Sequence, residues 1–193
     1  MSYLKHILLV LVLLVLASCS IFGSDDVNLS EPVELQNYDA QIEVDRIWRQ
    51  DVGSGPGEIH PVVYPAIDGD RLFVGDQSGQ VTAIDLSSGR RVWRQELDDV
   101  EVTGATGAGG DLVVVGTNEG DVIALSQADG SELWRVRVSS EVLTAPATNG
   151  DVVVVASVDG RVHGLNASDG SELWLASTTR PLLSVRGNAP PLI

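Results

Sequence analysis

Few residues in this 193-residue chain have the type and spacing that catalysis or metal binding requires. Asp98, Asp99 and Glu101 could share a calcium ion, but they lack the D-x-D-x-D-G pattern of a calcium loop and are expected to form a solvated loop. His60 and His163 lie far apart, without the cysteine or serine companions of zinc sites and catalytic triads. We therefore expect His163 to be a strand residue, and the chain to have no catalytic residue, metal site or cofactor.

A glycine-rich stretch at residues 53–58 (GSGPGE) is a poor candidate for a phosphate-binding loop. It opens no predicted helix and carries no lysine, whereas a phosphate-binding loop precedes a helix and contains a lysine. We interpret it as a linker.

The single cysteine, Cys19, has a sequence context that suggests lipid attachment. A positively charged start is followed by eleven apolar residues at 7–17, too few for a bilayer span of about 20, and then by LASC, which resembles a bacterial lipobox. We expect residues 1–18 to be a signal peptide and Cys19 to be the lipidated first residue of the mature chain. By resemblance to sorting rules, Ser20 rather than aspartate at the next position indicates the outer membrane. The alternative is an ordinary secretory signal with an accidental cysteine.

The charge balance limits the classes of partner. The chain has 27 acidic and 12 basic residues, a formal net charge of −15, and every acidic residue follows Cys19. Such a charge disfavours nucleic acid and anionic membrane surfaces as partners. Residues 19–45 are rich in carboxylates and show no sustained period, so we expect a flexible tether. A hydrophobic content of 44% predicts a globular remainder at 46–193.

A thirty-residue pattern is repeated three times without gaps, at 68–97, 109–138 and 149–178. Equivalent residues recur at periods of 41 and 40, typical of solenoids and propellers. Each copy contains two apolar runs joined by a glycine turn and an alternating segment, as in Leu112–Val115, Val122–Leu125 and Glu132–Val136. A further extended segment precedes each copy, which gives four strands per repeat, as in a propeller blade. These inner segments are expected at Val62–Ile67, Val102–Ala108 and Val142–Thr148.

A tryptophan and a glycine four residues before it end each copy, and we expect both to dock the blade structurally. The first copy reads A-x-D-x-x-S-G-x-x-x-W, which resembles the docking motif of the quinoprotein-type (PQQ-like) repeat. The later copies depart from it at Ser126, Asn166 and Gly164. No Trp-Asp dipeptide is present, which argues against WD40 repeats. The docking residues are Trp93, Trp134, Trp174, Gly89, Gly130 and Gly170.

Two further segments narrow the resemblance. Residues 47–52 (IWRQDV) repeat the last strand of a blade without the rest of it, and residues 183–187 (LSVRG) are similar to an L-S-L-R-G segment. Together with the lipobox and the repeats, they resemble the BamB family of propeller lipoproteins from the outer-membrane β-barrel assembly machinery. This resemblance implies a non-enzymatic scaffold that contacts the periplasmic domains of BamA through Leu183, Val185 and Arg186, with no small-molecule substrate.

The expected architecture is an all-β propeller of four-stranded antiparallel blades. The family's ring has eight blades, so three complete blades, an orphan closing strand and the start of a fourth predict a truncated chain. The alternative is a short protein that closes by self-association. If the orphan strand pairs with the far end of the ring, Trp48 should be exposed here, while Trp93, Trp134 and Trp174 should be protected.

Two other functions are compatible with the repeat. A quinoprotein dehydrogenase would need a PQQ pocket, a calcium ion and an axial aspartate, and no segment of this chain offers that cluster. A periplasmic ligand-sensing propeller is the third class.

Replacement of the cysteine tests the predicted lipid anchor. Cys19→Ala should move the protein from the membrane fraction to the periplasm, because anchoring depends on several acyl chains and one chain binds only marginally. Fractionation followed by immunoblotting measures the shift, with washing at high salt to remove protein held by partners. A variant that still pelleted after such washing would contradict lipidation.

Overall fold

The structure is a computed structural model in which residues 42, 44–53, 64–103, 105–177 and 190–193 are described. Residues Arg46–Ile193 form one compact unit, distinct from Met1–Asp45. The predicted signal peptide at 1–18 and almost all of the predicted tether at 19–45 lie outside the described residues. In the ranges given above, no helix has the length and hydrophobicity needed to cross a bilayer.

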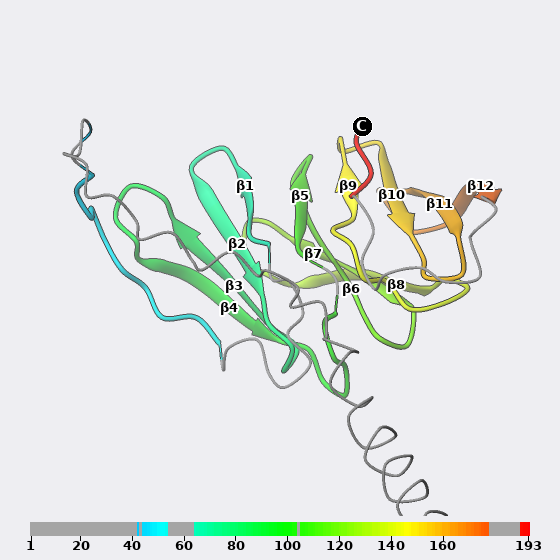
Figure 1. The fold of residues 1–193 in the computed structure, drawn as a ribbon, viewed down its shortest axis with the longest axis horizontal. Coiled ribbons are helices and arrows are strands. Elements are labelled where there is room, and N and C mark those ends of the chain that lie inside the picture. Colours follow the sequence, from blue (N-terminus) through cyan, green and yellow to red (C-terminus); the bar gives the residue numbers. More distant parts are fainter. Residues whose placement is uncertain (1–41, 43, 54–63, 104, 178–189) are drawn as a thin grey trace, which may run out of the picture. The chain divides into compact units, whose positions relative to one another are not determined.

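The described part of the compact unit contains three four-stranded antiparallel sheets (Figure 1). In each sheet the strands follow the chain order, so neighbouring strands are joined by short turns. This arrangement confirms the predicted propeller blades. The first blade contains β1 (Ala66–Asp68), β2 (Arg71–Gly75), β3 (Gln80–Asp85) and β4 (Arg91–Glu96); the second β5 (Gly107–Gly109), β6 (Leu112–Gly116), β7 (Asp121–Ser126) and β8 (Glu132–Arg137); the third β9 (Ala147–Thr148), β10 (Val152–Ala156), β11 (Arg161–Asn166) and β12 (Glu172–Ser177).

The innermost strands β1, β5 and β9 are shorter than predicted. Pro65 and Pro146 directly precede β1 and β9, and proline has no N–H to donate to a ladder. Val102, the predicted start of the second inner strand, makes an isolated bridge to Thr117. The three inner strands still lie side by side, β1 next to β5 and β5 next to β9.

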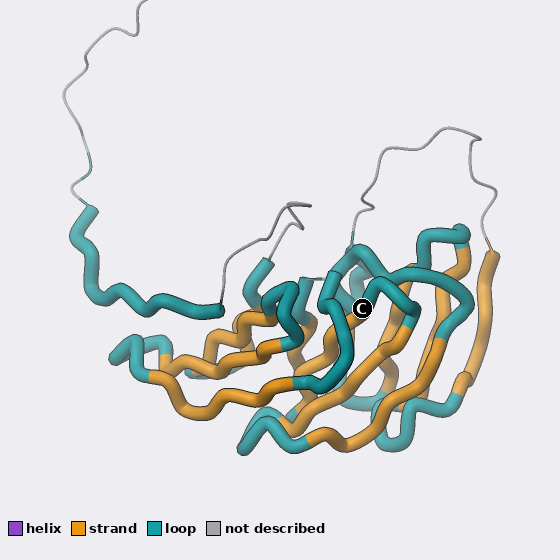
Figure 2. The backbone as a smooth tube through the Cα atoms, turned by 90° about the horizontal axis from the view of Figure 1, so that it is seen from below, coloured by secondary structure: helices purple, strands orange, loops and turns teal. Residues whose placement is uncertain are grey.

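The predicted strand at 47–52 also differs from the structure. Residues 46–53 run as loop and form no ladder with another described segment (Figure 2). A strand needs a neighbour to accept its hydrogen bonds, and the described residues provide none at this position.

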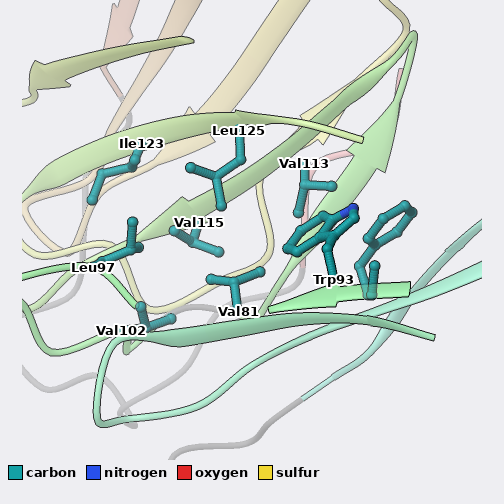
Figure 3. Close-up of a cluster of buried hydrophobic side chains, with 10 residues drawn as sticks. Val81, Trp93, Leu97, Val102, Val113, Val115, Ile123 and Leu125 are labelled. Atoms are coloured by element: carbon teal, nitrogen blue, oxygen red, sulfur yellow. The ribbon is translucent and has the colours of Figure 1, made fainter. Parts of the chain in front are cut away.

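The middle strands of the second blade are buried on both faces. In β6, every residue is buried, and alternate side chains enter two different clusters. Val113 and Val115 pack with Phe73 and Trp93 of the first blade (Figure 3), whereas Leu112 and Val114 belong to the cluster shared with the third blade. The period of two in a strand thus lets one sheet complete two cores. It also explains why the sequence shows continuous apolar runs.

Candidate functional site: the seams between blades

Each blade receives a tryptophan from the segment before it. The indole Nε1 donates a hydrogen bond to a backbone carbonyl in the turn between the third and fourth strands of the following blade. The glycine of that turn lies against the ring. The donor and acceptor pairs are Trp48 and Leu86 (2.7 Å), Trp93 and Gln127 (2.9 Å), and Trp134 and Ala167 (2.8 Å).

The seat requires glycine for two reasons, shown most clearly at Gly130. Its φ is +77°, a left-handed conformation that costs other residues free energy. A Cβ at this position would also lie 2.6 Å from Cε3 of Trp93. Gly89 and Gly170 meet Trp48 and Trp134 in the same way.

The contacts run between blades, which corrects two sequence predictions. Trp48 was expected to be exposed for want of a partner, but it is half-buried on the first blade. Trp174 was expected to be protected, yet it is 43% exposed, against 9% for Trp93 and 8% for Trp134. The cause is the direction of docking: a tryptophan is covered by the blade that follows it, and no described residues follow Trp174 in a fourth blade.

Gly164 explains the position of the uncovered ring. Ala83 and Ala124 stand opposite Trp93 and Trp134 across the last strand pair, and Gly164 stands opposite Trp174. A Cβ on Gly164 would lie 2.0 Å from Cε2 of Trp174, so the ring lies over the glycine of its own blade. An alanine would block this position.

The three different residues at the aspartate position of the docking motif have one structural role. Asp85 Oδ1 accepts hydrogen bonds from the backbone N–H of Ser88 and from two serine hydroxyls. In the other blades, Ser126 Oγ accepts from the N–H of Ala128, and Asn166 Oδ1 accepts from the N–H of Ser168. Side-chain oxygens of this kind stabilise tight turns, here the turn that seats a tryptophan.

These hydrogen bonds stabilise the ionised carboxylate of Asp85. The hydroxyl of Ser87, followed by the hydroxyl and N–H of Ser88, lowers the pKa of Asp85 from 3.8 to about 2. Hydrogen bonds from Ser131 lower the pKa of Asp129 in the equivalent turn of the second blade.

The seam between the first and second blades has an additional polar lock. The guanidinium of Arg71 donates to the carbonyl of Gln127, the same oxygen that Trp93 binds. The side-chain amide of Gln127 donates to Asp68 at 2.7 Å and to the carbonyl of Leu112 at 3.1 Å. Gln127 thus connects the second blade to strands β1, β2 and β4 of the first blade.

The third and fourth strands of each blade contain a second set of equivalent positions, and these carry different side chains in the three blades. At the second blade, Arg135 pairs with Glu132 at 2.9 Å, and the hydrogen bond between them raises the pKa of Arg135. At the third blade, His163 is 4% exposed; its Nδ1 lies 2.9 Å from Glu172 and its Nε2 lies 3.1 Å from the Ser139 hydroxyl. His163 is thus a strand residue, as expected, and it ties the preceding connection to the blade.

The equivalent positions of the first blade enclose a polar pocket of about 350 Å³ instead. It lies between residues 50–53 and the strands β3 and β4, and its lining includes Arg91 and Arg94. Neither arginine belongs to a motif that the sequence alone indicated as functional. A comparison of the repeats could have found Arg91, because Glu132 and Glu172 occupy the equivalent positions.

The other predicted functional residues are not brought together in the described ranges. Cys19, Leu183, Val185 and Arg186 all lie outside them. Within the described segments, no three His, Cys, Asp or Glu side chains gather closely enough to hold a metal ion.

A glycine substitution isolates the contribution of tryptophan docking. Gly130→Ala should lower the free energy of unfolding by about 2 to 5 kcal/mol, because left-handed strain and overpacking against Trp93 add together. Gly69→Ala is the matched control, since Gly69 has a φ of +58° but no atom within 4 Å of the position that an added methyl group would take. The control should lose about 1 to 2 kcal/mol in urea denaturation. Equal losses of unfolding free energy in the two variants would contradict the close contact between Gly130 and Trp93.

The turn carboxylate gives a pH-dependent prediction. The folded pKa of Asp85 lies below its ordinary value, so its stabilising contribution should be complete above about pH 4 and lost as the pH falls towards 2. NMR titration of the carboxyl carbon should give a pKa of about 2, raised by Ser87→Ala and by Ser88→Ala. Ser168→Ala, in the third blade, should leave it unchanged. An ordinary pKa for Asp85 would refute the turn geometry.

Comparisons with known proteins extend over most of the chain. The family model described as "Outer membrane protein assembly factor BamB" matches residues 40–106 and 99–193. A protein of the same description from Xanthomonas campestris pv. campestris is 40% identical over 169 residues, which cover 83% of this chain and 42% of the relative. The chain therefore spans less than half the length of that relative.

Solved structures agree with the sequence matches. The crystal structure of BamB from Moraxella catarrhalis superposes with a TM-score of 0.63 at 31% identity, over 68% of this chain and 39% of that one. A quinohemoprotein alcohol dehydrogenase from Comamonas testosteroni gives a TM-score of 0.50 at 20% identity, over 60% of this chain and 20% of that one, which indicates a shared fold alone. With the family model matching both halves of the chain, and with propeller blades joined by tryptophan seats, this chain belongs to the BamB family.

Proposed function

We propose that this protein is a non-enzymatic scaffold lipoprotein of the outer-membrane protein assembly complex. In this role it supports the folding and insertion of β-barrel proteins by binding the periplasmic domains of BamA. The observation that carries the proposal is the 40% identity to an outer membrane protein assembly factor across 83% of the chain.

The blade seams suit a scaffold because they make the blades rigid relative to one another. Each seam combines a buried apolar cluster with an indole hydrogen bond, and the first seam adds the lock around Gln127. A rigid framework holds its loops in fixed positions, which favours binding to a partner. The net charge of −15 makes nucleic acid an unsuitable partner.

The proposed contact with BamA lies in residues 183–187. Leu183 and Val185 would fill a shallow apolar pocket, while Arg186 would form a bidentate pair with a carboxylate. Arginine is enriched among residues that dominate binding energy. The alternative is that both apolar side chains form the inward face of a fourth blade and Arg186 is its solvated end.

The proposed location is the periplasmic side of the outer membrane, with Cys19 as the anchor. Eight-bladed closure in the whole protein would cover the exposed face of β12 and pair residues 47–52 with the last blade. The alternative functions, a quinoprotein dehydrogenase and a ligand-sensing propeller, gain no specific observation from the described residues that would favour them over the scaffold.

Arg186→Ala should weaken capture of BamA by about 2 kcal/mol or more, as expected for a residue that dominates an interface. The free energy of unfolding should change by no more than about 0.5 kcal/mol, as is usual for surface positions. Binding to immobilised BamA periplasmic domains and thermal unfolding measure the two quantities on the full chain.

Arg161→Ala is the matched control, because Arg161 is an exposed arginine of the third blade that pairs with Asp159. It should bind BamA normally. Unchanged binding of Arg186→Ala, or a loss of binding that follows a loss of folding, would place this segment in the core of a blade.

A further inference from the structure

The pocket at the first blade occupies positions that the other two blades fill. One lining residue in strand β3 is Thr82, and the equivalent residues Ile123 and His163 are larger; all three are buried. In strand β4 the equivalent of Arg91 is Glu132 in the second blade and Glu172 in the third. Compared with the other two blades, the first blade therefore has a smaller side chain in the third strand and the opposite charge in the fourth.

Two contacts hold the outer wall of the pocket in place. Trp48 docks on the turn of Leu86 and Gly89 at one end of the segment 46–53. At the other end, Gly53 has a φ of +63°, and a Cβ there would lie 2.0 Å from Oδ2 of Asp76. Such a close approach admits only glycine, so residues 50–53 are fixed against the first blade. The pocket is therefore built by the same docking that forms the seams.

The lining of the pocket combines two arginines with nearby carboxylates. Arg94 pairs with Glu96 at 2.6 Å, and Arg49 pairs with Asp51 at 3.4 Å. The carboxylate of Asp76, beside Gly53, accepts hydrogen bonds from the hydroxyl of Ser78 and the backbone N–H of Gln80. The guanidinium of Arg91 has no hydrogen-bond or ion-pair partner among the described residues. Its five N–H donors are thus available to a ligand.

Most other side chains of the lining are polar, with amides from Gln50 and Gln80 and hydroxyls from Ser78 and Thr82. Two of these groups already donate within the protein, the amide of Gln50 to the carbonyl of Asp51 and the hydroxyl of Ser78 to Asp76. A volume of about 350 Å³ lies at the lower end of the range for small-molecule sites. Guanidinium groups match the geometry of carboxylate and phosphate bidentately.

We propose that this pocket binds a small polar oxyanion, a phosphate or carboxylate group held by Arg91 with support from Arg94. The guanidinium of Arg91 makes the bidentate contact, and the amides and hydroxyls of the lining orient the rest of the ligand. The site is independent of the contact proposed for BamA, which lies in residues 183–187. It would make the closing seam of the propeller sensitive to a small anion, because one wall belongs to the segment 50–53.

Calorimetric titration of the full chain tests the site with inorganic phosphate in one arm and succinate in the other. Both arms are run in chloride buffer at constant ionic strength, so that screening does not change. We expect one of the two anions to bind at a single site. Arg91→Glu, which copies the residue of the second blade, should weaken that binding by at least about tenfold, because a charge-assisted hydrogen bond becomes a repulsion.

Thr82→Ile, which copies Ile123, should weaken binding to a similar extent by filling the pocket without a change of charge. Arg161→Glu is the control, because it makes the same charge change at an exposed site in the third blade. Circular dichroism establishes that each variant is folded, and Arg91→Glu alone decides the question if Thr82→Ile does not fold. The proposal is overturned if neither anion binds below about 10 mM. Equal weakening by Arg161→Glu and Arg91→Glu would also overturn it, since binding would then follow net charge.

Discussion

The seating of an indole ring on the glycine turn of the following blade is the interaction on which the rest of the structure depends. A blade is a twisted sheet with two apolar faces, and it is stable only when neighbours cover both. The tryptophan of the fourth strand crosses this gap and donates its N–H to a backbone carbonyl in a turn of the next blade. An indole buries a large area while its polar atom remains satisfied, which makes it suited to this position.

The docking has a direction, and this direction accounts for the pattern of exposure. The segment before the first blade is held because Trp48 has a turn to sit on, even though residues 46–53 have no strand partner among the described residues. Trp174 is left half-exposed because no described turn follows it. Each blade therefore stabilises the one before it by covering that blade's tryptophan. Loss of one turn therefore frees the tryptophan of its predecessor.

The seams share a mechanism but differ in their polar residues. The turn tolerates an aspartate, a serine or an asparagine because each supplies an oxygen that accepts a hydrogen bond from a backbone N–H two or three residues further along the turn. Away from the seat, the second blade uses an arginine–glutamate pair and the third uses His163. The first blade has Thr82 and Arg91 instead, and the pocket results. A repeated framework thus leaves room for one seam to acquire a separate property.

The sequence by itself determined the repeat, the fold class and three of the four strands in each blade. These features are local: the apolar runs, the turn glycines and the period of 41 and 40 residues can be read along the chain. The tertiary structure decided the partner of each tryptophan. Gly130 stands four residues before Trp134 in the sequence, yet it receives Trp93, because the ring points out of its own sheet and into the next. Spacing along a chain does not show which face of a sheet a side chain covers, or what lies opposite it. The pocket beside Arg91 could not be predicted for the same reason, since its walls come from segments that only folding brings together.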